Sequence, residues 1–143
     1  MEIIIRSIRE EDAGAVNQLS TQLGYSMSTG QTLANIRSVL GTTRHNAFVA
    51  LHEDKIVGWI GVAEALQIES APFNEIRGVI VDEQYRGHGI GKLLIERVKQ
   101  WSRETGNKTL RLRCNMTRKE AHLFYQHLGF KEIKEQKVFE MTV

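Results

Sequence analysis

The chain contains one glycine-rich turn, Val81-Asp82-Glu83-Gln84-Tyr85-Arg86-Gly87-His88-Gly89-Ile90-Gly91. The residues before it, 76–81, are mostly β-branched and predict a strand. The residues after it repeat at the i, i+3, i+4 spacing of a long amphipathic helix that ends near Gly106. Backbone amides at a helix N-terminus attract phosphate oxygens, and glycines let a ligand approach without a Cβ clash. The turn is therefore predicted to bind a phosphate-bearing ligand.

Two other glycine-rich phosphate motifs fit this turn poorly. A Walker A loop requires a glycine where Arg86 stands and a serine or threonine where Leu93 stands. The dinucleotide fingerprint requires a glycine at Lys92 and belongs in an early βαβ unit. The remaining alternative is a turn without a ligand. Three alternating glycines cost conformational entropy, however, and they gather where backbone is approached closely.

In the rest of the chain, segments with the hydrophobic spacing of strands are interspersed with segments that have the spacing of helices. Strands are predicted at residues 3–8, 47–51, 56–63, 76–81 and 110–112, with the last one or two at Ile133 and 138–143. Helices are predicted at residues 13–23, 28–41, 90–106 and 121–128. Gly78 interrupts its strand and indicates a bulge. The order β-α-α-β-β-β-α-β-α-β predicts a mixed sheet covered by helices.

Composition bounds the class of protein without naming a function. The 143 residues are 41% hydrophobic and 25% charged, which predicts one globular domain over residues 1–143. Cys114 is the only cysteine, so intramolecular disulfides and cysteine-rich zinc sites are excluded. Charged residues interrupt the first twenty positions and no apolar run reaches a membrane span, so a cytoplasmic protein without membrane contact is expected.

The glycine turn and a second motif together resemble a known family. Arg86, Gly89 and Gly91 match the acyl-CoA motif R/Q-x-x-G-x-G/A of the GNAT superfamily of N-acetyltransferases, and residues 121–130 resemble its A-x-x-x-Y signature ending in Gly-Phe. The resemblance covers essentially the whole chain. It implies an α/β (α+β) fold with a mixed, mostly antiparallel sheet of six to seven strands, splayed in its centre and flanked by about four helices.

The resemblance also implies acetyl-CoA as co-substrate and no metal. Its binding residues would be Val79, Ile80, Val81, Arg86, Gly87, His88, Gly89, Ile90, Gly91, Lys92, Asn115, Arg118 and Tyr125. An amide near Val79, on an edge freed by the bulge at Gly78, would stabilise the thioester oxygen. One departure from the family is Arg118, which stands where many members carry an asparagine that contacts the pantetheine arm.

Two catalytic residues follow from the resemblance. Tyr125 occupies the position that commonly protonates the thiolate, and a phenol is a neutral donor at pH 7. The alternative for Tyr125 is a core aromatic on a helical stripe. Glu75 precedes the cofactor strand and is the candidate general base, with a surface glutamate as the alternative. The His122 imidazole is a candidate proton-transfer group but is better interpreted as a helix-surface residue.

The amine acceptor is expected between the loop after the first helix and the splayed strands. Tyr25, Met27 and Glu75 are the candidate residues. Glu64, Glu69 and Glu75 occur without a lysine or arginine between them, which favours a cationic amine. A small molecule is favoured over a protein as acceptor.

Two other functions are alternatives to the enzyme. The first is a catalytically weak CoA-binding domain that acts as a sensor or scaffold. The second is nucleic-acid binding through Arg111, Arg113, Arg118 and Lys119, which is disfavoured because Arg111 and Arg113 resemble the wet face of a strand without an aromatic platform. The terminal strand could also pair between subunits and make a homodimer.

Overall fold

The computed structural model describes residues 1–114 and 116–143. The chain divides into two compact units, Met1–Arg113 and Cys114–Val143, which are described separately. The strands, all in the first unit, are β1 (Ile4–Ser7), β2 (His45–His52), β3 (Lys55–Ala65), β4 (Phe73–Val81) and β5 (Leu110–Leu112). The helices are η1 (Glu10–Asp12), α1 (Ala13–Gln22), α2 (Thr29–Leu40), η2 (Glu83–Tyr85), α3 (Ile90–Thr105) and, in the second unit, α4 (Lys119–His127).

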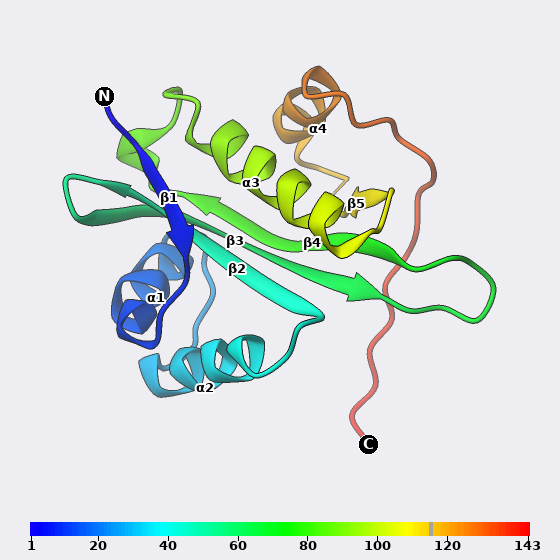
Figure 1. Ribbon diagram of the computed structural model, residues 1–143, viewed down its shortest axis with the longest axis horizontal. Coiled ribbons are helices and arrows are strands. Elements are labelled where there is room, and N and C mark those ends of the chain that lie inside the picture. The colour runs from blue at the N-terminus through cyan, green and yellow to red at the C-terminus, as the bar shows by residue number, and fades with distance from the viewer. Residues whose placement is uncertain (115) are drawn as a thin grey trace. The chain divides into compact units, whose positions relative to one another are not determined.

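The sheet runs in sequence order, β1-β2-β3-β4-β5 (Figure 1). The first four strands pair antiparallel and β5 joins β4 in parallel. The β2–β3 turn at Glu53 and Asp54 has positive φ values of 49° and 67°, as a tight two-residue hairpin requires. The predicted hairpin is therefore confirmed, with both strands longer than expected.

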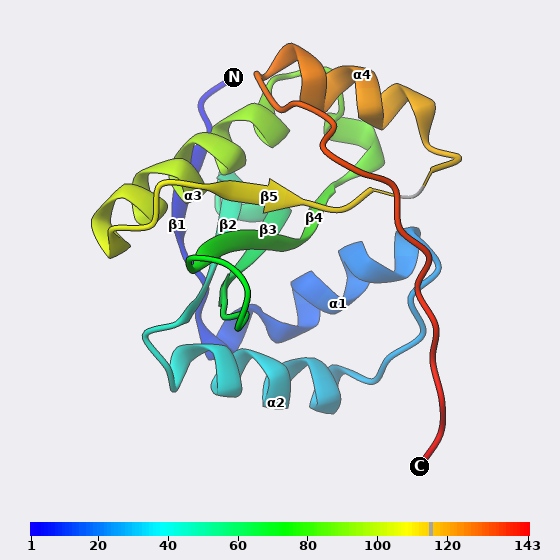
Figure 2. The same ribbon diagram turned by 90° about the vertical axis from the view of Figure 1, so that its right-hand side faces the viewer.

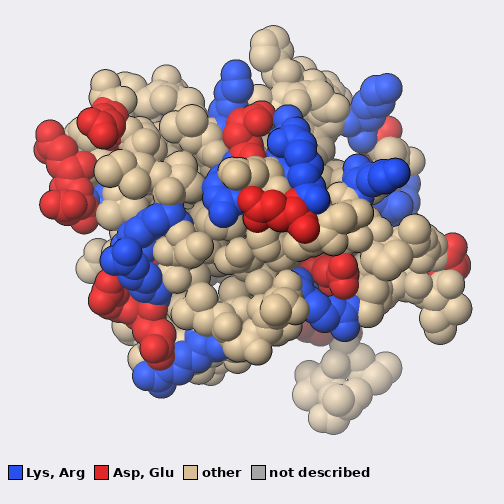
Figure 3. All heavy atoms as spheres, in the orientation of Figure 1, with Lys and Arg blue, Asp and Glu red and all other residues tan. Residues whose placement is uncertain are grey.

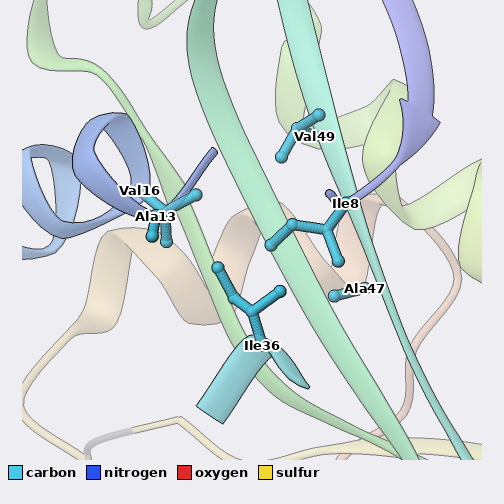
Figure 4. Packing of buried hydrophobic residues seen from close by; sticks show 6 residues of the cluster. All are labelled: Ile8, Ala13, Val16, Ile36, Ala47 and Val49. Carbon is cyan, nitrogen blue, oxygen red and sulfur yellow. The ribbon is translucent and has the colours of Figure 1, made fainter. Parts of the chain in front are cut away.

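Helices cover both faces of this sheet within the first unit. Seen in Figure 2, α1 and α2 lie against one face and α3 against the other. A buried apolar cluster lies between the sheet and the two helices on the α1/α2 face (Figure 4). Its residues come from the position after β1, from both helices and from β2: Ile8, Ala13, Val16, Ile36, Ala47 and Val49. On the α3 face, a Cβ at Gly58 would lie 3.3 Å from Leu94 Cδ1, so β3 and α3 pack closely there.

The predicted helix boundaries agree with the caps. The Ser28 side chain accepts a hydrogen bond from the Gln31 N–H at 3.0 Å, which is the N-cap expected at the start of α2. Gly106 ends α3 with a φ of 84°, a left-handed conformation that favours glycine. No helix in the described part of the chain is long and apolar enough to cross a membrane.

The predicted number of strands is wrong. In the described residues the sheet has five strands, and the segment with Ile133 and 138–143 contains neither helix nor strand. Phe139 there is 88% exposed and Val138 is 83% exposed. A strand needs a ladder partner and a covered face to be stable. Among the described residues, this segment has the hydrophobic period of a strand but neither a ladder partner nor a covered face.

Candidate functional site

The glycine turn joins β4 to α3, as predicted. Gly87 and Gly89 have φ values of 83° and 78°, and a Cβ built on either would meet no atom within 4 Å. These glycines are needed for their backbone conformation, since a left-handed φ costs other residues about 1–2 kcal/mol. The space above the turn is open to a ligand.

The first amides of α3 have no acceptor within the helix. The Leu93 N–H donates to the Gly89 carbonyl at 3.1 Å, the first main-chain bond of α3. The N–H groups of Ile90, Gly91 and Lys92 come before this bond and have no acceptor within the helix. They lie at the positive end of the helix dipole, which suits phosphate oxygens.

The residues leading into the turn are anchored to the body of the first unit. The Asp82 N–H donates to the Val57 carbonyl at 2.8 Å, and the Asp82 side chain accepts from the Gln84 N–H at 3.0 Å. The Tyr85 ring packs against His52 with centroids 5.5 Å apart. The turn is therefore held in place before a ligand arrives.

The free edge of β4 begins where its pairing with β5 stops. The parallel pairing covers only three positions and ends at Ile76 opposite Leu112, whereas β4 continues to Val81. Gly61 pairs with Gly78 but Val62 pairs with Ile76, so Arg77 is an extra residue. The bulge predicted at Gly78 thus lies beside it. Gly78 itself makes room for Trp59, whose Cη2 would be 2.8 Å from a Cβ.

Glu75 is buried at this point, with 4% of its surface exposed, so it is not a surface glutamate. Its Oε1 lies 3.1 Å from Arg77 Nη1, and its Oε2 lies 3.4 Å from Arg113 Nε. Its neighbour Asn74 donates to Ser102 of α3, so alternation along the strand points Glu75 to the α1/α2 face. The sequence alone left this face undetermined.

Arg111 lies across from Glu75 on the neighbouring strand. We expected its side chain to be exposed to solvent, and it is partly buried. It pairs with Glu75 in the parallel register, its guanidinium lies 4.1 Å from the Phe73 ring centroid, and its Nε is buried without a partner in the described residues. Arg113 is 61% exposed, as predicted. Arg77 and Arg111 were missed as site residues, because only the strand register brings them beside Glu75.

The carboxylates that favoured a cationic acceptor are largely neutralised within the fold. Glu64 lies 3.3 Å from Arg44 Nε and accepts from Asn107 Nδ2 at 2.8 Å. Glu75 has two guanidinium partners. Glu64 and Glu75 therefore do not provide the uncompensated negative charge that would favour a cationic acceptor.

Tyr25 and Met27 lie in the loop between α1 and α2. Both are exposed, and the Met27 carbonyl accepts a hydrogen bond from Asn17 Nδ2 at 2.7 Å. Among the described residues, no hydrogen bond or ring contact joins either of them to Glu75. Their role as substrate residues stays a prediction.

Tyr125 is described within the second unit. Its ring makes edge contacts with Phe124 and Phe130, at centroid separations of 5.4 and 6.1 Å. Burial raises the pKa of the Tyr125 phenol above its ordinary value; Cys114 adds to the rise and Arg118 opposes it. The phenol is therefore protonated at neutral pH, as a proton donor must be. Asn115 lies outside the described residues.

A separate buried carboxylate, Asp12, lies far along the chain from this site. Arg6 donates two hydrogen bonds to it, at 2.8 and 2.9 Å, and the Arg9 N–H donates a third. Burial raises the pKa of Asp12, but these bonds and the nearby positive charges outweigh it and leave the pKa below its ordinary value. The pair lines a cavity of about 690 Å³ whose walls include Asp82 but none of the turn glycines.

The charged side chains on one face of the described residues bear on the nucleic-acid alternative. On the face shown in Figure 3, basic and acidic side chains are interspersed. Nucleic-acid binding requires a concentrated basic patch or stripe. Nucleic-acid binding stays a disfavoured alternative.

Comparisons with known proteins agree with this geometry. Residues 15–130 match the model of the acetyltransferase (GNAT) family. An uncharacterised N-acetyltransferase of Chlorobaculum tepidum is 29% identical over 135 residues, covering 92% of this chain and 77% of the relative. The aminoglycoside N(6')-acetyltransferase type 1 of Stenotrophomonas maltophilia is 28% identical over 144 residues, covering 97% and 93%. The fold matches that of AAC(6')-Iy in complex with the bisubstrate analogue CoA-S-monomethyl-acetylneamine, with a TM-score of 0.89, 19% identity and 100% of both chains covered.

Proposed function

The chain belongs to the acetyltransferase (GNAT) family, and from this premise we propose that it transfers the acetyl group of acetyl-CoA to a primary amine by direct attack in a ternary complex. Residues 1–143 would act as one domain. The observation that carries the proposal is the turn before α3, where two left-handed glycines border open space and the first three amides of the helix have no acceptor within it.

Acetyl-CoA supplies the thioester carbonyl that the amine attacks. The amides from Arg86 to Lys92 would bind the pyrophosphate, with the exposed Arg86 guanidinium adding a charge-assisted contact. The free edge of β4 at Val79, Ile80 and Val81 would pair with the amides of the pantetheine arm. Asn115, Arg118 and Tyr125 stay proposed cofactor contacts from the family motif.

Glu75 would act as the general base and Tyr125 as the general acid. Glu75 takes a proton from the acceptor ammonium, either directly or through water, and leaves a neutral amine. The amine nitrogen bonds to the thioester carbon while the amide near Val79 stabilises the oxyanion, and the carbon–sulfur bond then breaks. The departing thiolate takes the Tyr125 proton, and the amide product loses its extra proton to solvent.

Two glycines at opposite ends of α3 provide the test of cofactor binding. We expect Gly89→Ala to weaken acetyl-CoA binding about tenfold or more in calorimetry, because alanine resists the left-handed conformation and its Cβ enters the ligand space. Gly106→Ala has the same backbone strain at the far end of the helix, with a φ of 84°. It should bind acetyl-CoA within about twofold of the wild type. Equal losses in both variants would contradict binding at the turn.

Release of free thiol with a panel of amines separates an enzyme from a CoA-binding sensor. Tyr125→Phe should lower kcat about tenfold to 100-fold with little change in the KM for acetyl-CoA, since general acids contribute at least this much. It should also remove the alkaline limb of the kcat profile, where the raised pKa of Tyr125 places deprotonation above the ordinary value of 10.0. Tyr85→Phe, which loses only a hydroxyl near His52, is the control. An unchanged profile in Tyr125→Phe would remove this residue from the mechanism.

A further inference from the structure

We propose that the acceptor amine also carries an acidic group, a carboxylate or a phosphonate, which binds to Arg77, Arg111 and Arg113 around Glu75. This inference rests on the proposed function, because it names the substrate class of the same site. It replaces the cationic amine favoured by the sequence alone.

The charges at this point of the sheet do not balance. Arg77 and Glu75 come from β4, and Arg111 and Arg113 come from β5 and the residue after it. Three arginines and one glutamate therefore lie at neighbouring positions of the two strands. Glu75 contacts two of them, Arg77 and Arg113, and Arg111 is its register partner on the neighbouring strand. An excess of positive charge in a small area attracts an anion.

The guanidiniums have hydrogen-bonding capacity left over. Each guanidinium has five N–H donors in a rigid fork, and Glu75 lies beside only one nitrogen of Arg77 and one of Arg113. The side chains of Arg77 and Arg113 are 58% and 61% exposed, so their other donors are accessible. The Arg111 Nε is buried and finds no acceptor among the residues that the structure describes. An anion that binds these forks would also offset the positive charge on Arg111.

The spacing along β4 fits a short amino acid or aminoalkyl acid. Strand residues rise about 3.3 Å each, so Arg77 is about 7 Å from Val79, where the thioester oxygen is proposed to lie. A chain of two or three carbons separates amine and acid by about 4–5 Å, and the long, flexible arginine side chain covers the rest. With the acid on the arginines, the ammonium group lies near Glu75, which is the only carboxylate in the cluster. One carboxylate beside exposed arginines is complementary to a zwitterion.

The same arrangement acts against a diamine. Its second ammonium would meet the guanidiniums in place of the acid, and like charges brought together without a counterion are unfavourable. The arginines therefore attract an acceptor with an acidic group and repel one with a second ammonium group.

The test uses the full chain and four amines of similar length: β-alanine, 2-aminoethylphosphonate, n-propylamine and 1,3-diaminopropane. We expect both acids to have a kcat/KM at least tenfold above that of n-propylamine, with the diamine lowest, because a charge-assisted contact is worth about tenfold or more. Comparing the two acids identifies carboxylate or phosphonate as the preferred group. Arg77→Gln and Arg113→Gln should each lower kcat/KM for the preferred acid about tenfold more than kcat/KM for n-propylamine, a ratio in which any effect on Glu75 itself cancels. Arg103→Gln, on the exposed last turn of α3, is the matched control and should change neither.

Each outcome decides between the two proposals. Preference for the diamine, or equal loss for all amines in the arginine variants, would overturn the acidic acceptor and leave the acetyltransferase in place. Absence of thiol release with every amine, despite bound acetyl-CoA, would count against the proposed function. In that case, calorimetry of the two acids with wild type and Arg77→Gln still tests the arginine site. Binding of neither acid to the wild type would refute it.

Discussion

Asp12 and Glu75 are two equally buried carboxylates, each 4% exposed and each held by arginine, in different parts of the first unit. Asp12 accepts two short hydrogen bonds from Arg6, whose side chain is only 21% exposed. Glu75 has longer contacts to Arg77 and Arg113, whose side chains are mostly exposed. The carboxylates are alike, and the difference lies in their partners.

This difference separates a structural ion pair from a candidate site. Arg6 uses both terminal nitrogens on Asp12, so little of its donor capacity is left for a ligand. The arginines around Glu75 keep most of their donors in water, where an incoming anion can take them. Burial of a carboxylate therefore does not mark a functional residue by itself. The exposure of the groups that neutralise it is more informative.

The largest expected effect is on catalysis at Glu75. Glu75→Gln should lower kcat about 100-fold, because the acceptor ammonium loses its base. The rate should recover at a pH where the free amine forms unaided. Stability should fall by less than about 1 kcal/mol, since the arginines left behind are solvated. Chemical denaturation and initial rates across pH measure the two quantities.

Asp12→Asn is the reciprocal variant for this comparison and should leave kcat within about twofold of the wild type. If Glu75→Gln retained full activity at neutral pH, or if Asp12→Asn lost as much as Glu75→Gln, the distinction between the two carboxylates would be wrong.

A smaller effect is expected on stability at Asp12. Asp12→Asn should lower the free energy of unfolding by about 2 kcal/mol at pH 7, because Arg6 is left largely buried without its counterion. Folding lowers the pKa of Asp12, so the stability that it contributes is complete above its ordinary value of 3.8 and is lost as the pH falls through the lower native pKa. Unfolding curves of both proteins between pH 7 and pH 2 should therefore converge at the acidic end. A constant gap across this range would show that the ionised pair is not the cause.

Much of the site near the turn could be predicted from local sequence. Glycines that alternate before an amphipathic helix indicate a helix N-terminus with accessible amides, and the structure adds that Gly87 and Gly89 both have a positive φ. The arginine cluster could not be predicted in this way. Glu75 and Arg111 are far apart in sequence, and the bulge at Arg77 breaks the period that would place side chains on a face.

The C-terminal segment shows the same limit for the fold. The apolar pattern at residues 133–143 resembles that of β2 and β3, yet only the latter two form strands. β2 and β3 are joined by a two-residue turn and supply each other's hydrogen bonds, whereas the described residues include no strand pairing for residues 133–143.

The sequence by itself determined the order of the elements, the caps of the helices and the glycine turn, because each depends on backbone preferences of residues close in the chain. Only the tertiary structure decided which way Glu75 points, which arginines neutralise it and where β4 loses its partner. Those features depend on strand register across distant segments, and a shift of one residue would exchange the two faces of the sheet.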